Sequence, residues 1–494
     1  MPGTDARQST PVEHGYASNV QHVAILVSPD HDGTLLYKLS KLTPATTYYY
    51  KFADKGTGQQ SRTGRFTTAP AADSNVGVTF TFSGDQDGTP NTTTPSLTCP
   101  GEAGFKSFTS AMNEAGNQFY VNLGDTIYSD SSCLTTPDSS LTDYRNNYQQ
   151  NLSYPSLRDF RAAAPFYTQW DDHEVQNDFD PTTVDPTLLA NGRQAFQEYD
   201  AMRPPSSTLG FYRHFRYGAN AEVFILDERS FRTNEADRID ANANGTEDCQ
   251  NATTGQPDVA PTLNQSTRNF FAAQIPGLGL DQPVPRLCLK NLNAKGRTML
   301  GSAQRHQFLS DLAASTATWK IVMSEDPMQQ FFAFPYDRWE GFRWERNTIL
   351  HNIDDNNINN VVWLATDVHA FMAHTVDYNT DTAGSPSVVP ACAGVQGMCE
   401  YTVGPVATDT FAKEINDLSG SSTASGKVRG FLVVVNKDLC AGINNYGYGK
   451  VNIDGATHQL SVYPKFENGT AVAGNGGSGS GYSDCYDLHQ NPAP

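Results

Sequence analysis

Several features that define common protein classes are missing from this sequence. No apolar run approaches about 18 residues, so no membrane-spanning helix is expected. The eight cysteines include no CxxC pair, which argues against a structural zinc site. Lysine and arginine number 34 against 53 aspartates and glutamates, and the net charge of −19 argues against a nucleic-acid partner. No internal repeat is visible, and the sequence leaves the oligomeric state open.

The cysteines favour an oxidising compartment. All eight lie in loop-like stretches rather than in apolar runs, and an even number in loops is typical of disulfides. Scattered free thiols are the alternative. Proximity in sequence favours a Cys392–Cys399 pair, and the other pairings stay open. The N-terminal MPGTDARQST lacks the basic and apolar regions of a signal peptide. The expected secreted or periplasmic location therefore depends on the cysteines and on the composition.

Residues 1–70 are predicted to form a small all-β module. The stretches HVAILVSP, LLYKLSKL, TTYYYKFAD and SRTGRFTTAP alternate apolar and polar residues between turn signals, which is the period of a β-strand. About four strands are visible, whereas a complete fibronectin-like sandwich needs about seven. We therefore expect a truncated sandwich, followed by a linker at residues 71–75. A plain β-extension of the main domain is the alternative.

Residues 76–470 have the pattern of an α/β domain. Strand-like runs alternate with predicted helices at residues 104–115, 187–202 and 302–315. Two polar, loop-rich spans, 233–298 and 376–430, are interpreted as surface insertions. The stretches FLVVVNK and HQLSVYPKF are predicted to be closing strands, and residues 471–494 form a Gly/Ser-rich tail.

Carboxylates follow several of the predicted strands. Five short apolar runs each end in an aspartate: FTFSGDQD, YVNLGDTIY, YTQWDDHEVQND, FILDERSFR and VVWLATDVHA. Side chains at the carboxyl ends of neighbouring strands converge on one crevice in an open α/β sheet. Carboxylates gathered in this way repel one another unless a multivalent cation lies between them. The pattern therefore predicts a metal site.

Two of these motifs add ligands of other types. In GDTIY, Asp125 precedes Tyr128 by three residues, and a phenol ionises readily when it binds a strong Lewis acid such as Fe³⁺. In TDVHA, Asp367 and His369 project to the same side of an extended backbone. The alternatives are a turn aspartate beside a packing tyrosine, and a capping aspartate beside a surface histidine.

The remaining motifs supply further candidates. In WDDHEVQND, Asn177 is a neutral oxygen ligand and His173 is either a general acid or an orienting group, unless the segment is a solvated acidic loop. FSGDQD supplies Asp85, with Asp87 as the weaker candidate. In LDERSFR, a buried Asp–Arg scaffold pair is the first interpretation, and phosphate binding by Arg229 is the second.

The ordered set of motifs resembles the PhoD-like alkaline phosphatase and phosphodiesterase family, a branch of the calcineurin-type metallophosphoesterases. The resemblance runs from about Leu36 to about Lys450. It includes the β-module, GDTIY, WDDHEVQND, LDERSFR, MLGSAQRHQFLSDL and TDVHA. It implies a two-sheet sandwich flanked by helices and a hydrolase of phosphoric esters. His173 and Arg229 are the catalytic candidates.

The resemblance also implies a set of metal ligands: Asp85, Asp125, Tyr128, Asn177, Asp367 and His369. Asp125 would bridge two metals, with Tyr128 and His369 at an Fe³⁺ site, and Asn177 and Asp367 at a site that holds Ca²⁺ in the family. Much of the family has a cysteine where this chain has Asp85. The substitution resembles the ferric site of purple acid phosphatases. A hard oxygen in place of sulfur keeps Fe³⁺ acceptable and disfavours Zn²⁺, Mn²⁺ or Mg²⁺ in its place. Zn²⁺ and Mn²⁺ are alternatives to Ca²⁺ at the second site.

The substrate class is less defined by the sequence. Small-molecule phosphate esters are the expected partners, and a phospholipase D-like phosphodiesterase with lipid substrates is the alternative enzyme. A secreted calcium-binding adhesion module is the non-enzyme alternative. Residues 329–346, QQFFAFPYDRWEGFRWER, are rich in aromatics and arginine. They are expected either to form a wall of the substrate pocket or to pack as a helix on the core.

Overall fold

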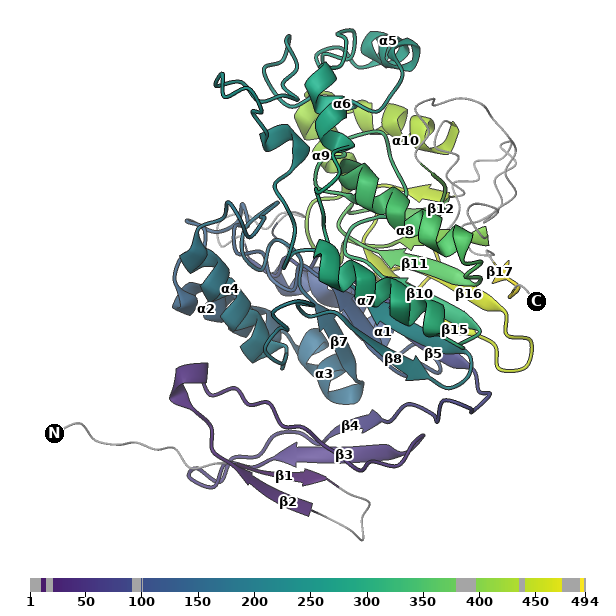
Figure 1. The fold of residues 1–494 in the computed structure, drawn as a ribbon. Coiled ribbons are helices and arrows are strands. Elements are labelled where there is room, and N and C mark those ends of the chain that lie inside the picture. The colour runs from purple at the N-terminus through teal and green to yellow at the C-terminus, as the bar shows by residue number, and fades with distance from the viewer. Residues whose placement is uncertain are drawn as a thin grey trace, which may run out of the picture.

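The structure, a computed structural model, describes residues 10–14, 21–90, 99, 101–378, 397–434, 440–472 and 489–492. Two large β-sheets lie face to face, with helices on their outer sides and a small third sheet below them (Figure 1). This arrangement confirms the predicted α/β class and the two-sheet sandwich.

The first large sheet has six strands in the order β17-β16-β15-β5-β6-β7. Their bounds are β5 Val78–Ser83, β6 Tyr120–Leu123, β7 Phe166–Gln169, β15 Gly447–Ile453, β16 Leu460–Phe466 and β17 His489–Gln490. Strands β5, β6 and β7 are parallel, so their carboxyl ends lie at one edge. Strands β15 and β16 extend the sheet in antiparallel register.

The second large sheet has seven strands in the order β14-β12-β13-β11-β10-β9-β8. Their bounds are β8 Arg213–Tyr217, β9 Ala221–Ile225, β10 Trp319–Met323, β11 Val361–Ala365, β12 Phe371–Thr375, β13 Cys399–Thr402 and β14 Cys440–Gly442. Strands β9, β10, β11 and β13 are parallel. Their fully buried, β-branched and aromatic composition is typical of central parallel strands.

The core between the sheets is built from alternate residues of the strands. In β5, Val78, Phe80 and Phe82 face inward, and in β11, Val362 and Leu364 do so. Because successive side chains of a strand point to opposite faces, the intervening residues pack outward. This period of two explains why short apolar runs of the sequence form a sandwich.

Helices cover the outer faces of both sheets (Figure 1). The long helices α7 and α8 pack on the seven-stranded sheet, and α1 and α3 pack on the six-stranded sheet. The helix bounds are α1 Lys106–Met112, α2 Leu141–Ser153, α3 Pro155–Ala163, α4 Pro186–Tyr199, α5 Gln265–Gln274, α6 Arg286–Leu292, α7 Gly301–Ala314, α8 Arg343–Asp355, α9 Phe411–Ser419 and α10 Ala424–Val434. The three helices predicted from sequence correspond to α1, α4 and α7.

The N-terminal part forms a four-stranded antiparallel sheet, in the order β2-β1-β3-β4. Its bounds are β1 Thr10–His14, β2 Gln21–Ile25, β3 Thr47–Phe52 and β4 Gly64–Thr67. The number of strands matches the prediction, but the stretch LLYKLSKL is not a strand, and β1 supplies the fourth. This part of the chain contacts the two-sheet domain through an ion pair of 2.5 Å between Arg62 and Asp159 of α3.

Two sequence interpretations need correction in the C-terminal half. The span 376–430 is not only a surface insertion, because β13 pairs between β12 and β11 within the large sheet. The stretch FLVVVNK was predicted to be a strand, but residues 431–434 end helix α10. The apolar character of a short stretch does not distinguish a buried strand from a buried helix, since either one buries the same side chains. Residues 474–482 of the predicted tail lie outside the described residues.

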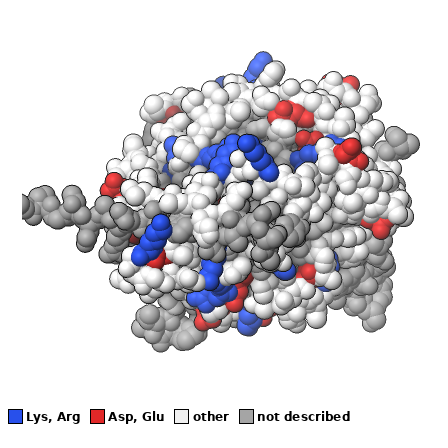
Figure 2. Space-filling model, turned by 90° about the horizontal axis from the view of Figure 1, so that it is seen from below, with Lys and Arg blue, Asp and Glu red and all other residues white. Residues whose placement is uncertain are grey.

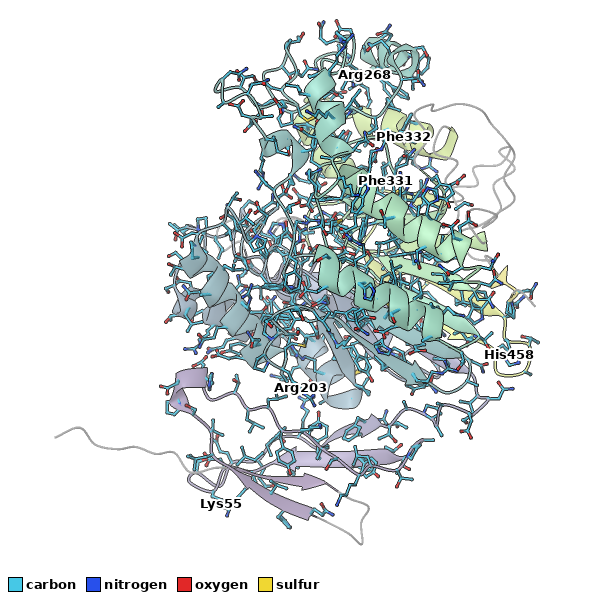
Figure 3. All side chains as sticks on the ribbon, in the orientation of Figure 1. Lys55, Arg203, Arg268, Phe331, Phe332 and His458 are labelled. Carbon is cyan, nitrogen blue, oxygen red and sulfur yellow. A yellow bond between two sulfur atoms is a disulfide. The ribbon has the colours of Figure 1, made fainter. Side chains whose placement is uncertain are left out.

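The span 233–298 forms a separate layer that carries α5 and α6. Arg268, labelled in the upper part of Figure 3, is fully buried there and binds Asp258 through both terminal nitrogens at 2.7 and 2.8 Å. A disulfide joins Cys249 to Cys288, and another joins Cys99 to Cys133. Cys399 is also disulfide-bonded, whereas Cys392 lies outside the described residues.

Two surface properties complete the fold. Within the described part of the chain, no helix combines the length and the apolar character that a membrane crossing requires. On the face seen from below, Lys and Arg side chains form small separate groups among acidic and uncharged residues (Figure 2).

Candidate metal centre and substrate cavity

Four predicted strand-end carboxylates meet at one edge of the sandwich. Asp85 follows β5, Asp125 follows β6, Asp172 follows β7 and Asp367 follows β11. The first three belong to one sheet and the fourth to the other, so the site forms where the carboxyl ends of both sheets adjoin. A cavity of about 420 Å³ opens here and is lined by Asp125, Asp172 and Asp367 among others.

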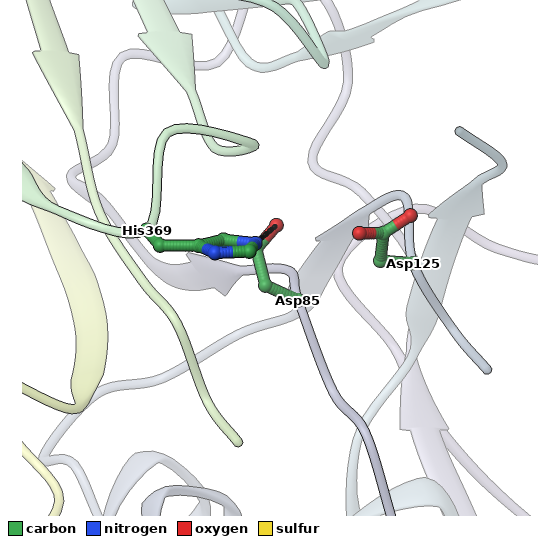
Figure 4. A group of neighbouring side chains, drawn as sticks. All are labelled: Asp85, Asp125 and His369. Atoms are coloured by element: carbon green, nitrogen blue, oxygen red, sulfur yellow. Dashed lines mark ion pairs between the residues drawn. The ribbon is translucent and has the colours of Figure 1, made fainter. Parts of the chain in front are cut away.

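Asp85, Asp125 and His369 form the first cluster, with one ligand atom from each within 4.8 Å of the others. Figure 4 shows the His369 ring beside Asp85, with Asp125 opposite. The phenol oxygen of Tyr128 lies 3.2 Å from His369 Nε2. The structure thus brings together all four residues that the resemblance assigns to a ferric site.

The backbone at these residues is strained. Asp85, Asp125, Asp367 and His369 all have positive φ, between 50° and 63°. This left-handed region costs an L-residue about 1–2 kcal/mol. Such strain persists where the surrounding structure enforces it, and it concentrates at functional sites. The strained turns aim the side chains away from their strands and toward one another.

Asp85 has the environment expected of a ligand without its cation. The side chain is 1 % exposed, and Oδ2 has no hydrogen-bond partner, while Oδ1 accepts from the Asp367 N–H at 3.2 Å. Burial raises the pKa of Asp85 to about 6. Gly404 allows the close approach, since a Cβ there would lie 2.3 Å from Asp85 Oδ2. A buried, unpartnered carboxylate oxygen fits a hard cation.

Asp87, the weaker sequence candidate, has a structural role. Its Oδ1 accepts from the Thr89 N–H at 2.8 Å, and its Oδ2 accepts from the Ser131 hydroxyl at 2.5 Å. The loop that follows β5 therefore occupies one carboxylate oxygen, and the loop that follows β6 occupies the other.

Glu414 is a residue that the sequence interpretation missed. Its Oε1 lies 2.5 Å from His369 Nδ1, which leaves Nε2 as the nitrogen on the side of Asp85 and Tyr128. A carboxylate on the second imidazole nitrogen is the usual way to fix the orientation of a metal-binding histidine. Glu414 lies on α9, within the span interpreted as an insertion, and no motif marks it.

Asp125, Asp172 and His173 form a second cluster that shares Asp125 with the first. Burial raises the pKa of Asp125 well above its ordinary value, and its neighbour Asp172 adds to this, whereas His173 opposes it. Asn177, the predicted ligand of the second metal, is exposed on the cavity lining, and its backbone N–H donates to Asp130 at 2.7 Å. Asp172 lies at the cluster instead, although it was only one of several acids in its motif.

His173 is held in a defined orientation. Its Nδ1 lies 2.5 Å from Asp130 Oδ1, and its ring stacks on Tyr128 with the centroids 4.1 Å apart. Burial acts to lower the pKa of His173, but the carboxylates of Asp172, Asp125 and Asp130 raise it well above its ordinary value. The ring of His173 therefore borders the cavity with its pKa raised by three carboxylates.

Arg229 lies away from the cavity, and its contacts match the scaffold interpretation. The guanidinium is fully buried, its Nε donates to Asp171, and its terminal nitrogens bind Asp337 at 2.9 and 2.7 Å. Asp227, the aspartate of the same motif, accepts from the Arg229 backbone N–H at 3.2 Å and from Trp170 Nε1 at 3.0 Å. Because the donors of Arg229 are taken, we do not assign it to phosphate binding.

The aromatic segment 329–346 has both of its expected roles. Phe334, Tyr336 and Arg338 line the cavity. Trp339 and Phe342 instead pack in the core beneath α8. The change from cavity wall to core occurs at the 3-10 turn Trp339–Phe342, directly before helix α8.

Comparisons with known proteins agree with this geometry. The family description "PhoD-like phosphatase" matches residues 96–462. Alkaline phosphatase D of Bacillus subtilis (strain 168) is 27% identical over 381 residues, and the match covers 70% of this chain. The chain spans only about half of that relative, 54% of its length.

Solved structures share the fold. A structure of PhoD superposes with a TM-score of 0.66 at 19% identity, covering 96% of this chain and 82% of that one. A purple acid phosphatase from yellow lupin (Lupinus luteus) superposes with a TM-score of 0.54 at 12% identity, covering 94% and 69%. The family match spans most of the sequence and includes the strand-end motifs after β6, β7 and β11. The chain therefore belongs to the PhoD-like phosphatase family.

Proposed function

We propose that this protein is a secreted, metal-dependent hydrolase of phosphoric esters. The observation that carries the proposal is the convergence of Asp85, Asp125, Tyr128 and His369 at the carboxyl ends of strands from two sheets. Hard oxygen donors with one tyrosine and one histidine suit a trivalent cation. The buried Oδ2 of Asp85, which lacks a partner, supports a bound cation at this position.

The donor sets favour two cations. Asp85, Asp125, Tyr128 and His369 would hold Fe³⁺. Asp125 would be shared with a second cation, Ca²⁺ by preference and Zn²⁺ or Mn²⁺ as alternatives, for which Asp172, Asn177 and Asp367 are the candidate ligands. Two adjacent cations polarise the phosphoryl oxygens of a bound ester and generate a hydroxide nucleophile near neutral pH.

His173 is the proposed proton donor to the leaving group. Asp130 binds Nδ1, so Nε2 is the nitrogen available toward the cavity. The carboxylates of Asp172, Asp125 and Asp130 raise the pKa of His173, which favours the protonated ring that a general acid needs. Stacking on Tyr128 fixes the plane of the ring beside the metal centre.

A lipid phosphodiester is the second candidate substrate class. It is favoured by apolar side chains on the cavity wall, namely Val259, Phe334 and Leu418. These side chains could accept an apolar part of the substrate that a bare monoester lacks.

Elemental analysis and kinetics on one purified preparation test the proposal. We expect iron and a second metal, with turnover of aryl phosphate monoesters and diesters. Faster hydrolysis of phosphatidylcholine than of either would favour the lipid enzyme. Calcium binding without iron and without turnover of any ester would support the adhesion module instead. Asp73→Asn, an exposed change in the linker, is the matched control for variants of the strand-end aspartates.

A further inference from the structure

The cavity lining carries a strongly unequal charge. Among the described residues that line it, eight are acidic: Asp125, Asp172, Asp178, Glu235, Asp237, Asp337, Asp367 and Glu414. Arg338 is the one lysine or arginine among them. Cations at the metal centre would offset the acids nearest to them, and Asp337 is paired with Arg229. Asp178, Glu235 and Asp237 remain as the acids of the outer wall.

Arg338 is fixed next to the metal centre. Its NH1 donates to the carbonyl of Ala333 at 3.1 Å, and its guanidinium lies over the Phe331 ring, 5.2 Å from the centroid. Phe331 is labelled in the upper half of Figure 3. The Nε of Arg338 lies 3.8 Å from Asp367 Oδ2, which is an ion pair without a hydrogen bond.

The N–H groups of Arg338 have different hydrogen-bond acceptors from those of the buried arginines nearby. Arg229 and Arg232 both bind carboxylates through close hydrogen bonds. Arg338 instead donates a hydrogen bond to the carbonyl of Ala333. A guanidinium has five N–H donors, and their fork-like arrangement matches the oxygens of a phosphate group. The remaining donors of Arg338 are therefore available to an anion that lies beside Asp367.

We propose that Arg338 binds a nonbridging oxygen of the phosphoryl group, and that the cavity thereby selects phosphate esters whose leaving group carries no negative charge. The inference rests on the proposed function and names the substrate class for that same site. The single guanidinium beside the metal centre can bind one phosphoryl group. A second anionic group on the same substrate would have to lie against the acidic wall of the cavity.

Asp178, Glu235 and Asp237 of that wall share one neighbouring arginine, Arg238, and Glu235 is the most buried of the three. It is 3 % exposed, and its Oε1 has no hydrogen-bond partner. Its nearest cationic atom is Arg238 NH2, at 3.7 Å, which also lies 3.5 Å from Asp178. A carboxylate or second phosphate placed here would meet three acids that share one arginine, and like-charge repulsion is an effective way to reject a competing ligand. Neutral apolar leaving groups meet Val259 and Phe334 without that penalty.

Binding of phenylphosphonate to the metal-loaded protein, measured by calorimetry, tests the role of Arg338. Arg338→Gln should weaken binding by about tenfold or more, and Arg338→Lys by less, because a charged phosphate contact is lost or only made singly. Arg203→Gln removes the same charge at an exposed position outside the cavity lining and should leave the affinity unchanged. Affinity within twofold of wild type in Arg338→Gln would overturn the proposal. So would loss of metal from that variant, since Arg338 would then act by holding Asp367.

The proposed selection against anionic leaving groups is tested by comparing the affinities of two phosphonates. 4-Carboxyphenylphosphonate should bind wild type about tenfold more weakly than phenylphosphonate, and Glu235→Gln or Asp237→Asn should narrow the difference. Equal affinities in wild type would overturn the selection. Both measurements are independent of turnover. A protein that binds phenylphosphonate through Arg338 but hydrolyses no ester would contradict the proposed function alone.

Discussion

The phenol oxygen of Tyr128 lies 3.2 Å from Nε2 of His369, although 241 positions separate the two residues in the sequence. Tyr128 follows β6 of the six-stranded sheet, and His369 follows β11 of the seven-stranded sheet. The face-to-face packing of the sheets, through the shared apolar core, brings their carboxyl ends together. The ferric site that we propose is therefore a property of the sandwich and not of either sheet.

Tyr128→Phe should abolish the colour of the protein. A tyrosinate bound to Fe³⁺ gives a visible charge-transfer band, and phenylalanine cannot supply the phenolate. Absorption spectra of wild type and variant at equal iron content measure this. Tyr144→Phe is a control, because Tyr144 is buried but donates to the Val175 carbonyl. A colourless wild-type enzyme that is fully active without iron would refute the ferric assignment.

Asp125→Asn should reduce kcat by at least about 10²–10³, since loss of a single electrostatic stabiliser costs that much in other enzymes. Asp125 belongs to both clusters of candidate ligands, so its loss affects both cations. Initial rates on an aryl phosphate, with metal content measured on the same sample, check the prediction. Retention of a tenth of the wild-type kcat would exclude a bridging role.

Asp85→Ala should lose iron while the fold survives, and Asp85→Cys should restore binding with a shifted absorption band. Sulfur is softer than oxygen but remains an acceptable ligand. Gly404→Ala should imitate Asp85→Ala, because the added Cβ would lie 2.3 Å from Asp85 Oδ2. Iron content by elemental analysis and folding by circular dichroism are the two readouts. Full iron content in Asp85→Ala would make Asp85 a loop residue.

Most of the cysteines should be in disulfide bonds. Denatured, unreduced protein should show few free thiols, since Cys99–Cys133 and Cys249–Cys288 are bonded and Cys399 is bonded as well. The double variant Cys249→Ala with Cys288→Ala should lose about 2–4 kcal/mol of unfolding free energy. Thiol counting and denaturant unfolding measure these effects. A count near eight would remove the main support for a secreted protein.

Stability should fall as the pH rises through neutrality, in part because of Glu400. Burial raises the pKa of this β13 side chain from 4.5 to about 7. The folded state then holds the proton more tightly than the unfolded state, so the contribution is complete below about pH 4.5 and is lost as the pH rises through about 7. Glu400→Gln should remove up to about 3 kcal/mol of this dependence. Urea unfolding at pH 5 and pH 8 measures it.

The exposed variant Glu102→Gln is the control for that series, and it should follow the wild-type profile. A Glu400→Gln protein with the same pH dependence as wild type would show that Glu400 does not carry the effect.

The sequence alone determined the strands and the chemistry at their ends. Periodicity identified β5, β6, β7, β9 and β11, because short apolar runs that precede glycine and aspartate have few other structures open to them. The motifs GDTIY and TDVHA identified Tyr128 and His369 as candidate ligands, because the donor atom of a ligand is set by the residue type. The family followed from the order of these motifs.

Tertiary structure decided what each carboxylate and guanidinium does. Asp85 and Asp87 are two residues apart and of the same type, yet packing leaves Oδ2 of Asp85 without a partner and satisfies both oxygens of Asp87. Arg229 and Arg338 are the same residue type, but burial between carboxylates occupies the first, and the cavity wall leaves donors of the second free. The hydrogen-bond partners of these side chains come from segments that are distant in the sequence, as Glu414 does for His369. The local sequence does not determine which distant segments come into contact.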